Sequence, residues 1–176
     1  MPRPGRIGLP RRAGDGMGAE HLWAAWLCNR GKLNITQLPC TAFSCTVSAN
    51  QTITDSAAGG TALACGVKTN NAMLGQTPDG AACESLAEYF RHRGMATGLV
   101  VTADHQTGGL AILDGSAERG QVRAVFTTGK HSGVAVPVYA AGAGAGRFHG
   151  VIQNTQVAHL IKKSVASEAG DVLENR

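Results

Sequence analysis

Long apolar runs, CxxC cysteine pairs and aromatic residues are what this sequence has least of. No apolar stretch reaches the roughly 18 residues of a membrane-spanning helix. Arg6 and Arg11 interrupt the apolar segments near the start, so no secretory signal is visible. The five cysteines include no CxxC spacing, which argues against a structural zinc site. Together these features favour a single compact domain with no membrane span.

Glycine, in contrast, is abundant. The chain of 176 residues contains 24 glycines and 43% hydrophobic residues, but only 5% aromatic residues. Its length is typical of one domain, and its apolar content is sufficient for a core of that size. Many glycines with few aromatics favour short strands, tight turns and closely packed helices. We therefore expect a layered α/β protein.

Basic residues are concentrated at the start of a chain whose net charge is +4. Arginine and proline crowd residues 1–13, which we expect to form a disordered, solvated leader to a single domain over residues 14–176. A nucleic-acid-binding arm is the alternative, but no aromatic side chain lies among the arginines to stack on bases. Proline and arginine also do not suit a central strand, so we expect no strand before Gly14.

Cysteine usage leaves two interpretations open. The odd count leaves at least one thiol unpaired. Cys40 and Cys45 could pair across a loop in an oxidising compartment. The other interpretation is that most cysteines serve as small buried apolar residues.

Periodicity predicts alternating helices and strands. The predicted helices cover residues 19–29, 57–64 after Asp55 and Ser56, 81–93 and 155–165. Predicted strands are one or two within 32–48, then 97–102, 108–113 and 134–140, the last with Pro137 favouring a sheet edge. A buried strand directly after a helix indicates a parallel sheet. Asp104 and His105 follow such a strand, where open α/β sheets bind ligands.

Polar residues beside glycines or strand ends suggest a metal site. They are Asp15 in GDGMG, Ser56 in TDSAAGGTA, and Asp104 and His105 in TADHQTGG. Two carboxylates, an imidazole and a serine oxygen suit Zn²⁺, and a metal-bound alkoxide is a strong nucleophile. A serine at a helix N-terminus also lies where a phosphate is favoured. Taken singly, the same residues could be a helix cap, a turn residue and a core histidine.

Four stretches of the sequence, taken in order, resemble alkaline phosphatases. They are DGMG (15–18), TDSAAGGTALACGVKTNNAMLG (54–75), VVTADHQTGGLAI (100–112) and TGKHSGVAVPVYA (128–140). The serine stretch is the most specific of them. The resemblance implies a three-layer α/β fold with a mostly parallel central sheet.

The resemblance also implies roles for individual residues. Asp15 matches an aspartate that bridges zinc and magnesium, and Ser56 matches the serine that attacks phosphorus and carries the phosphoryl group. Asp104 and His105 match ligands of the zinc that activates this serine, and His131 matches a ligand of the second zinc. The cofactors implied are Zn²⁺ and Mg²⁺, and the substrate is a small phosphate monoester. A homodimer and a periplasmic or extracellular location are also implied.

One family segment has no counterpart here. Between Gly94 and Gly108 the family has a long stretch that supplies the remaining magnesium ligands, an arginine that grips phosphate, and the aspartate and histidine of the second zinc site. We therefore expect an incomplete fold and weak or absent turnover. The alternative to an enzyme is a non-catalytic metal- or phosphate-binding remnant. A third hypothesis is a related hydrolase that acts on sulfate esters or phosphodiesters. The serine stretch favours a phosphatase over that hydrolase.

Overall fold

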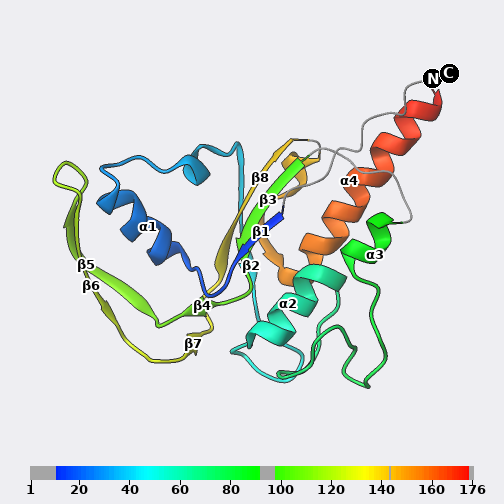
Figure 1. Cartoon of the computed structure of the whole chain (residues 1–176), viewed down its shortest axis with the longest axis horizontal. Helices are drawn as coiled ribbons and strands as arrows, with labels where there is room; N and C mark the ends of the chain where they lie inside the picture. The colour runs from blue at the N-terminus through cyan, green and yellow to red at the C-terminus, as the bar shows by residue number, and fades with distance from the viewer. Residues whose placement is uncertain (1–10, 92–97, 143, 175–176) are drawn as a thin grey trace.

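A five-stranded sheet forms the centre of the computed structural model, which describes residues 11–91, 98–142 and 144–174 (Figure 1). The strands lie in the order β1-β3-β8-β2-β9. Their bounds are β1 Arg11–Gly14, β2 Cys40–Cys45, β3 Gly98–Ala103, β8 Val136–Gly142 and β9 Gly150–Gln153. β1 runs parallel to β3 and β9 parallel to β2, whereas β8 is antiparallel to both of its neighbours. All strands except β8 therefore point the same way, and the predicted mostly parallel α/β sheet is confirmed.

Helices cover one face of this sheet. They are α2 Ser56–Cys65, α3 Leu86–Arg91 and α4 Asn154–Glu174 (Figure 1). Alternate residues of the strands, such as Val100, Val138 and Ala140, face these helices and are buried together with Val157 and Ile161 of α4. Burying each of the larger side chains contributes about 1.5–3 kcal/mol. The hydrophobic core thus lies between the sheet and α4.

The other side of the sheet carries a helix and a hairpin (Figure 1). They are α1 Ala19–Cys28 and the antiparallel pair β5 Leu110–Ser116 and β6 Gln121–Phe126. The short strands β4 Gln106–Thr107 and β7 His131–Ser132 pair with each other, and two 3-10 helices cover Asn34–Gln37 and Ala145–Arg147. Leu22 and Leu27 of α1 are buried. The predicted three layers are therefore present.

Part of the second sheet face is uncovered. Phe43 of β2 and Val151 of β9 are register partners, and they are 43% and 70% exposed. Apolar side chains on a sheet face are normally covered by another layer. This open face agrees with the expected incomplete fold.

The helix that carries Ser56 begins and ends where the sequence indicates. Asp55 caps its start, because the Asp55 side chain accepts a hydrogen bond from the backbone N–H of Ala58. Gly66 ends it with φ at +74°, a left-handed conformation that favours glycine. α1 also matches its prediction, and α4 starts one residue earlier than expected and continues well beyond residue 165.

The helix predicted over residues 81–93 is shorter at its start. It begins at Leu86, because Ser85 and Glu88 form reciprocal capping bonds there. Ahead of it the chain is extended, with Ala82 bridged to Gln76. Residues 92–97, where the predicted helix would end, lie outside the described residues.

The expectation of no strand before Gly14 is wrong. β1 begins at Arg11, inside the stretch predicted as a leader, and pairs with β3 at the edge of the sheet. An edge strand pairs on one side only and tolerates charged residues, which explains how this sequence can occupy it. Residues 1–10 lie outside the described residues, so the leader itself stays a prediction.

The expected edge position of Pro137 is also wrong. Its strand, β8, lies at the centre of the sheet, and Pro137 pairs with Phe43 of β2. The ladder between β8 and β3 starts only at Tyr139, so the missing N–H of Pro137 falls outside it. On that side the hydroxyl of Thr102 donates to the Pro137 carbonyl at 3.0 Å.

Neither expectation about cysteine holds. Cys40 and Cys45 occupy opposite ends of β2, which separates their Cα atoms by about 16 Å at the usual rise of a strand. A disulfide requires roughly 4.4–6.8 Å, so the two cannot pair. Of the five cysteines, all free, only Cys65 is buried.

Across the ranges that the structure describes, every helix is too short or too polar to traverse a lipid bilayer.

Candidate metal centre

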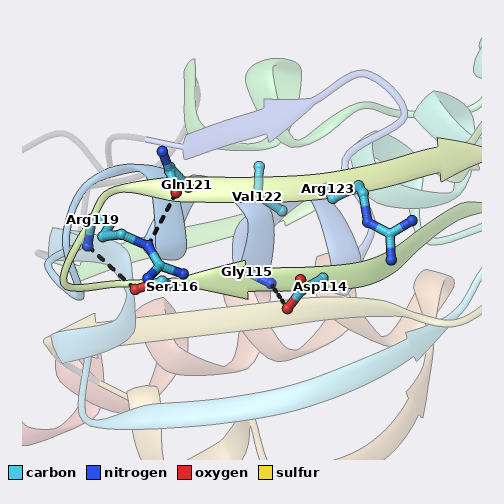
Figure 2. A pocket seen from close by; sticks show the side chains of 7 residues that line it. All are labelled: Asp114, Gly115, Ser116, Arg119, Gln121, Val122 and Arg123. Carbon is cyan, nitrogen blue, oxygen red and sulfur yellow. Dashed lines mark hydrogen bonds between the residues drawn. The ribbon is translucent and has the colours of Figure 1, made fainter.

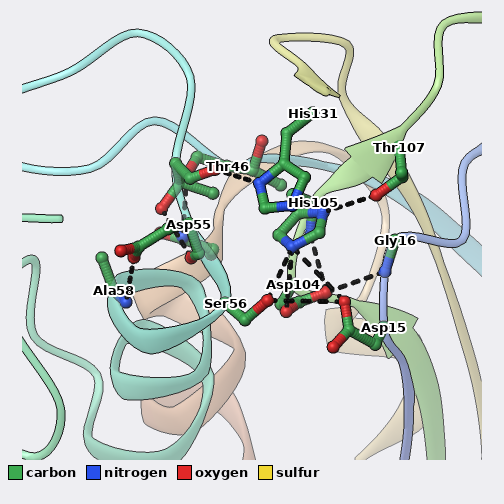
Figure 3. Close-up of polar contacts among 12 residues, drawn as sticks. Asp15, Gly16, Thr46, Asp55, Ser56, Ala58, Asp104, His105, Thr107 and His131 are labelled. Carbon is green, nitrogen blue, oxygen red and sulfur yellow. Dashed lines mark hydrogen bonds and ion pairs between the residues drawn. The ribbon is translucent and has the colours of Figure 1, made fainter. Parts of the chain in front are cut away.

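Three separate segments meet at one edge of the central sheet. β1 and β3 are parallel neighbours, with Gly14 opposite Ala103, so the next residues, Asp15 and Asp104, leave the sheet side by side. The N-terminus of α2 brings Ser56 to the same place (Figure 3). The sheet register therefore gathers residues that are distant in the sequence.

The polar atoms of these residues converge on His105. Its Nε2 lies 3.0 Å from the Oγ of Ser56, 3.4 Å from Oδ1 of Asp15 and 3.4 Å from Oδ2 of Asp104 (Figure 3). The Ser56 hydroxyl also lies 3.4 Å from Oδ1 of Asp15, to which it can donate. Potential ligand atoms of Asp15, Asp104 and His105 all lie within 4.8 Å of one another.

These separations fit a tetrahedral zinc ion. Zinc bonds to nitrogen and oxygen of about 2.0–2.1 Å place neighbouring ligand atoms roughly 3.3–3.4 Å apart. The distances of 3.4 Å from His105 Nε2 to each of the two carboxylates match this value. Two carboxylate oxygens and one imidazole nitrogen are ligands that Zn²⁺ takes in proteins, and the Ser56 oxygen lies where a catalytic site keeps its fourth position open. The residues present therefore fit the metal.

Backbone contacts fix the Asp104 side chain. Its Oδ1 accepts hydrogen bonds from the backbone N–H of Gly16 at 3.1 Å and of His105 at 3.0 Å. These bonds leave Oδ2 directed at the His105 ring. Gly59 of α2 packs against the same residue, since a Cβ at Gly59 would lie 2.8 Å from the Asp104 carbonyl oxygen. Asp104 thus links the end of β3 both to the loop that follows β1 and to helix α2.

His105 is fully buried, and its environment favours a neutral ring. Burial lowers the pKa of His105, and the nearby His131 ring lowers it further, against the opposing effect of Asp104 and Asp15. A neutral imidazole has one nitrogen with a free lone pair. Nδ1 lies 3.2 Å from the hydroxyl of Thr107, so Nε2 is the nitrogen that faces the carboxylates.

Ser56 is exposed and occupies the first position of α2. Asp55, just before it, accepts bonds from the backbone N–H groups of Ala58 and of Ala72, which tie the start of α2 to the following loop. The remaining N–H groups at a helix start and the helix dipole favour an anion such as phosphate. Ser56 is therefore accessible to solvent and lies where a helix N-terminus favours binding of an anion.

His131 lies beside this group but not in it. Its ring stacks on that of His105, with centroids 3.5 Å apart and an interplanar angle of 20° (Figure 3). Its Nδ1 lies 2.9 Å from the carbonyl oxygen of Thr54 and can donate to it. The group of potential ligands found among the described residues comprises Asp15, Asp104 and His105 without His131.

Two residues of this site, Gln106 and Thr107, were not predicted from the sequence. Gln106 is buried, and its Oε1 accepts from the backbone N–H of Gly109 at 3.2 Å and from the Ser132 hydroxyl, next to His131. Thr107 contacts His105 through its hydroxyl. They are the first and second residues after His105, but nothing in the spacing of polar residues distinguishes them from ordinary loop residues.

A separate hollow of about 360 Å³ lies along the β5–β6 hairpin (Figure 2). Its lining consists of Asp114, Gly115, Ser116, Arg119, Gln121, Val122 and Arg123. Arg119 donates to Gln121 across the turn at 3.1 Å. None of the residues predicted for the metal site lines this hollow.

Comparison with known families identifies the chain. The family model described as alkaline phosphatase matches residues 13–114 and 114–167. The chain belongs to the alkaline phosphatase family. Among curated members, alkaline phosphatase 4 of Bacillus subtilis is 50% identical over 52 residues, which are 30% of this chain and 11% of that protein. Alkaline phosphatase 3 of the same organism is 34% identical over 101 residues, 52% of this chain and 21% of that protein. The chain thus spans about a fifth or less of these relatives.

Solved alkaline phosphatase structures have the same fold. The enzyme from the Antarctic bacterium TAB5 superposes with a TM-score of 0.79 at 17% identity, covering 90% of this chain and 98% of that one. A variant of that enzyme with magnesium bound gives a TM-score of 0.80 at 16% identity, covering 90% and 97%. The cold-active enzyme of Shewanella sp. gives 0.78 at 13% identity, covering 90% and 100%.

Proposed function

We propose that this chain is a metal-dependent phosphomonoesterase in which Ser56 is the nucleophile. The observation that carries the proposal is the 3.0 Å contact between Ser56 Oγ and His105 Nε2, at a helix start and beside two carboxylates. Membership of the alkaline phosphatase family supports the same reaction. The substrate class is a small phosphate monoester.

Separate residues of the chain would bind the metal and the phosphate. Asp15, Asp104 and His105 would hold Zn²⁺, which when bound supplies a Lewis acid that makes the serine hydroxyl more acidic. The Ser56 hydroxyl, whose Oγ lies 3.4 Å from Asp15 Oδ1 in this structure, would release its proton to solvent once the metal is bound. The free N–H groups at the start of α2 would hold the phosphate oxygens.

The reaction itself would occur at Ser56. The Ser56 Oγ–phosphorus bond forms as the ester P–O bond breaks, and the leaving alcohol takes up a proton. Water then attacks phosphorus, so that phosphate leaves and the serine hydroxyl is restored. His131 would belong to a second zinc site beside the first. The Asp15 side chain is 76% exposed, which leaves its other oxygen open to Mg²⁺, the ion bound in the TAB5 variant.

We expect turnover to be slow. The family's phosphate-gripping arginine and the partners of His131 in the second zinc site have no counterpart in this sequence. Losing one such electrostatic group typically costs about 3 kcal/mol, or roughly a hundredfold in rate, and several losses multiply. The alternative function, a non-catalytic metal- or phosphate-binding remnant, is favoured by the small size of the ligand group, which within the described ranges has three members.

Hydrolysis of an aryl phosphate at alkaline pH by the purified full chain, with Zn²⁺ and Mg²⁺ added, tests the proposal. We expect measurable release of phenolate, abolished in Ser56→Ala, together with phosphoserine at position 56 after an acid quench. If the chain hydrolyses no aryl phosphate but binds zinc, and Asp104→Ala removes that binding, the proposed enzyme activity is overturned. The chain would then be a non-catalytic metal-binding remnant. Sedimentation and cell fractionation test the homodimer and the periplasmic or extracellular location that the family resemblance implies.

A further inference from the structure

Thr107 lies at the candidate metal centre between the Asp15 loop, the His105 ring and the strand that carries His131. Its backbone N–H donates to the carbonyl of Gly16, next to Asp15, at 3.0 Å. In the β4–β7 ladder it is the register partner of His131. Its side-chain Oγ1 lies 3.2 Å from Nδ1 of His105 (Figure 3). One residue thus contacts the Asp15 loop, the His105 ring and the His131 strand.

Close packing holds the Thr107 hydroxyl against the ring. A Cβ at Gly16 would lie 2.2 Å from Thr107 Oγ1 and 2.8 Å from Thr107 Cβ, so the backbone of Gly16 covers the threonine directly. Gly16 has φ at +74°, a left-handed conformation that favours glycine. Larger side chains are therefore excluded from position 16, and the hydroxyl is confined between Gly16 and His105.

This contact bears on which nitrogen of His105 can bind a cation. Nε2 faces Ser56 and the two carboxylates, so it is the nitrogen that would bind. It can do so only if its lone pair is free, which places the ring hydrogen on Nδ1. A hydroxyl oxygen can accept that hydrogen. Metal-bound histidines almost always donate their second N–H to an acceptor, commonly a carboxylate, a backbone carbonyl or water, and here the Thr107 hydroxyl occupies that place.

We propose that Thr107 is a positioning residue for the metal centre: its hydroxyl accepts the Nδ1–H of His105 and so orients Nε2 toward the cation. The proposal rests on the metal site of the proposed function. Thr107 touches neither the phosphate nor the cation in this role. Serine keeps the hydroxyl, whereas valine keeps the shape of threonine and loses the acceptor.

Zinc affinity of the full chain, measured by competition with a chromophoric chelator, tests this role. Thr107→Val is expected to weaken Zn²⁺ binding roughly 10–100-fold, the usual effect of removing such a partner, and Thr107→Ser by less than about threefold. Circular dichroism of each variant checks that the fold is retained. Equal zinc affinity of wild type and Thr107→Val would overturn the proposal.

Nitrogen-15 NMR of the His105 ring gives a readout that does not need the metal. In the zinc-free chain, Thr107→Val is expected to shift the Nδ1 resonance, because its hydrogen-bond partner is gone, and Thr107→Ser to restore it. An Nδ1 resonance unchanged in Thr107→Val would overturn the contact. If the wild type binds no zinc, the proposed metal centre is wrong. The nitrogen-15 resonances of His105 then decide by themselves whether the Thr107 hydroxyl is hydrogen-bonded to the His105 ring.

Discussion

Ser56 Oγ lies 3.0 Å from Nε2 of His105, although 49 residues separate them in the sequence. The contact depends on how closely α2 approaches the end of β3. Gly59 permits this approach, because a Cβ at this position would lie 2.8 Å from the Asp104 carbonyl oxygen. Substitutions at Gly59, Asp104 and Asp55 test which groups hold Ser56 and His105 together.

Two adjacent glycines of α2 should respond in opposite directions to the same substitution. A methyl group at Gly59 would lie 2.8 Å from the Asp104 carbonyl oxygen, whereas a methyl group at Gly60 meets nothing within 4 Å. Gly59→Ala should therefore cost about 1–3 kcal/mol of unfolding free energy through overpacking. Gly60→Ala should stabilise the helix by about 0.5–1 kcal/mol.

Urea unfolding of both variants, with zinc affinity measured alongside, provides the check. Gly59→Ala is also expected to weaken zinc binding, since Asp104 must move to make room. Gly60→Ala serves as the matched control and should bind zinc like the wild type. Equal stability changes in the two variants would contradict the close packing of α2 against Asp104.

The two oxygens of Asp104 have separate roles that two substitutions can distinguish. Asp104→Asn keeps Oδ1 as an acceptor for Gly16 and His105 but replaces the charged oxygen that faces the ring. Its unfolding free energy without metal should stay within about 1 kcal/mol of wild type, while zinc binding falls. Asp104→Ala should lose zinc binding and also about 1–3 kcal/mol, because buried N–H groups lose their acceptor.

Thermal unfolding with zinc, and after a chelator removes it, measures both effects. Zinc should raise the melting temperature of the wild type, because a ligand that binds only the folded state stabilises it. The chelator should reverse this rise, and Asp104→Asn should show neither change. A zinc-dependent rise retained in Asp104→Asn would place the ion elsewhere.

Asp55 holds the start of α2, and so the position of Ser56. Replacing it with alanine removes the cap on Ala58 and the bond from Ala72, which should cost about 1–2 kcal/mol. Asp55→Asn keeps an oxygen for the cap on Ala58 but loses the acceptor for Ala72, so it should lose less than Asp55→Ala. Denaturant unfolding compares the two, and a loss in Asp55→Asn as large as in Asp55→Ala would contradict a stabilising role for the cap on Ala58.

Stability at alkaline pH should depend on Cys65. Burial raises the pKa of the Cys65 thiol from its ordinary value of 9.0, with Cys83 and Glu88 acting in the same direction and Lys162 opposing them. The folded state therefore keeps this proton to higher pH than the unfolded state. The resulting stabilisation is complete below pH 9.0 and is lost as the pH rises through the folded-state pKa.

Unfolding free energies of wild type and Cys65→Ala at pH 7.5 and at several values above 9 isolate this effect. The wild type should lose stability more steeply than Cys65→Ala as the pH rises, because the variant lacks the thiol. Only the wild type carries the Cys65 thiol, so the difference in slope between the two proteins is the relevant quantity. Parallel curves would contradict the assignment to Cys65.

Local features of the sequence were sufficient to predict the helix and the strand that carry much of the site. Asp55 before a run of small residues predicted the start of α2, and the apolar run before Asp104 predicted β3. Both depend on interactions within a few residues, namely helix capping and burial of a short strand. The family resemblance, not periodicity, linked these segments to one reaction.

Pairing between strands that are distant in the sequence decided the features of the sheet that local patterns did not predict. β1 forms from an arginine-rich stretch because β3 offers it a partner, and Pro137 lies at the sheet centre because the ladder to β3 begins only at Tyr139. No local pattern encodes either outcome.

The sequence by itself determined which residues could bind a metal and which serine begins a helix, because these properties belong to the residues and their immediate neighbours. Only the tertiary structure decided that Ser56 Oγ meets His105 Nε2 and that Thr107 occupies the other side of the ring. Those contacts arise from the register of β1 beside β3 and from the close approach at Gly59, which join residues far apart in the chain.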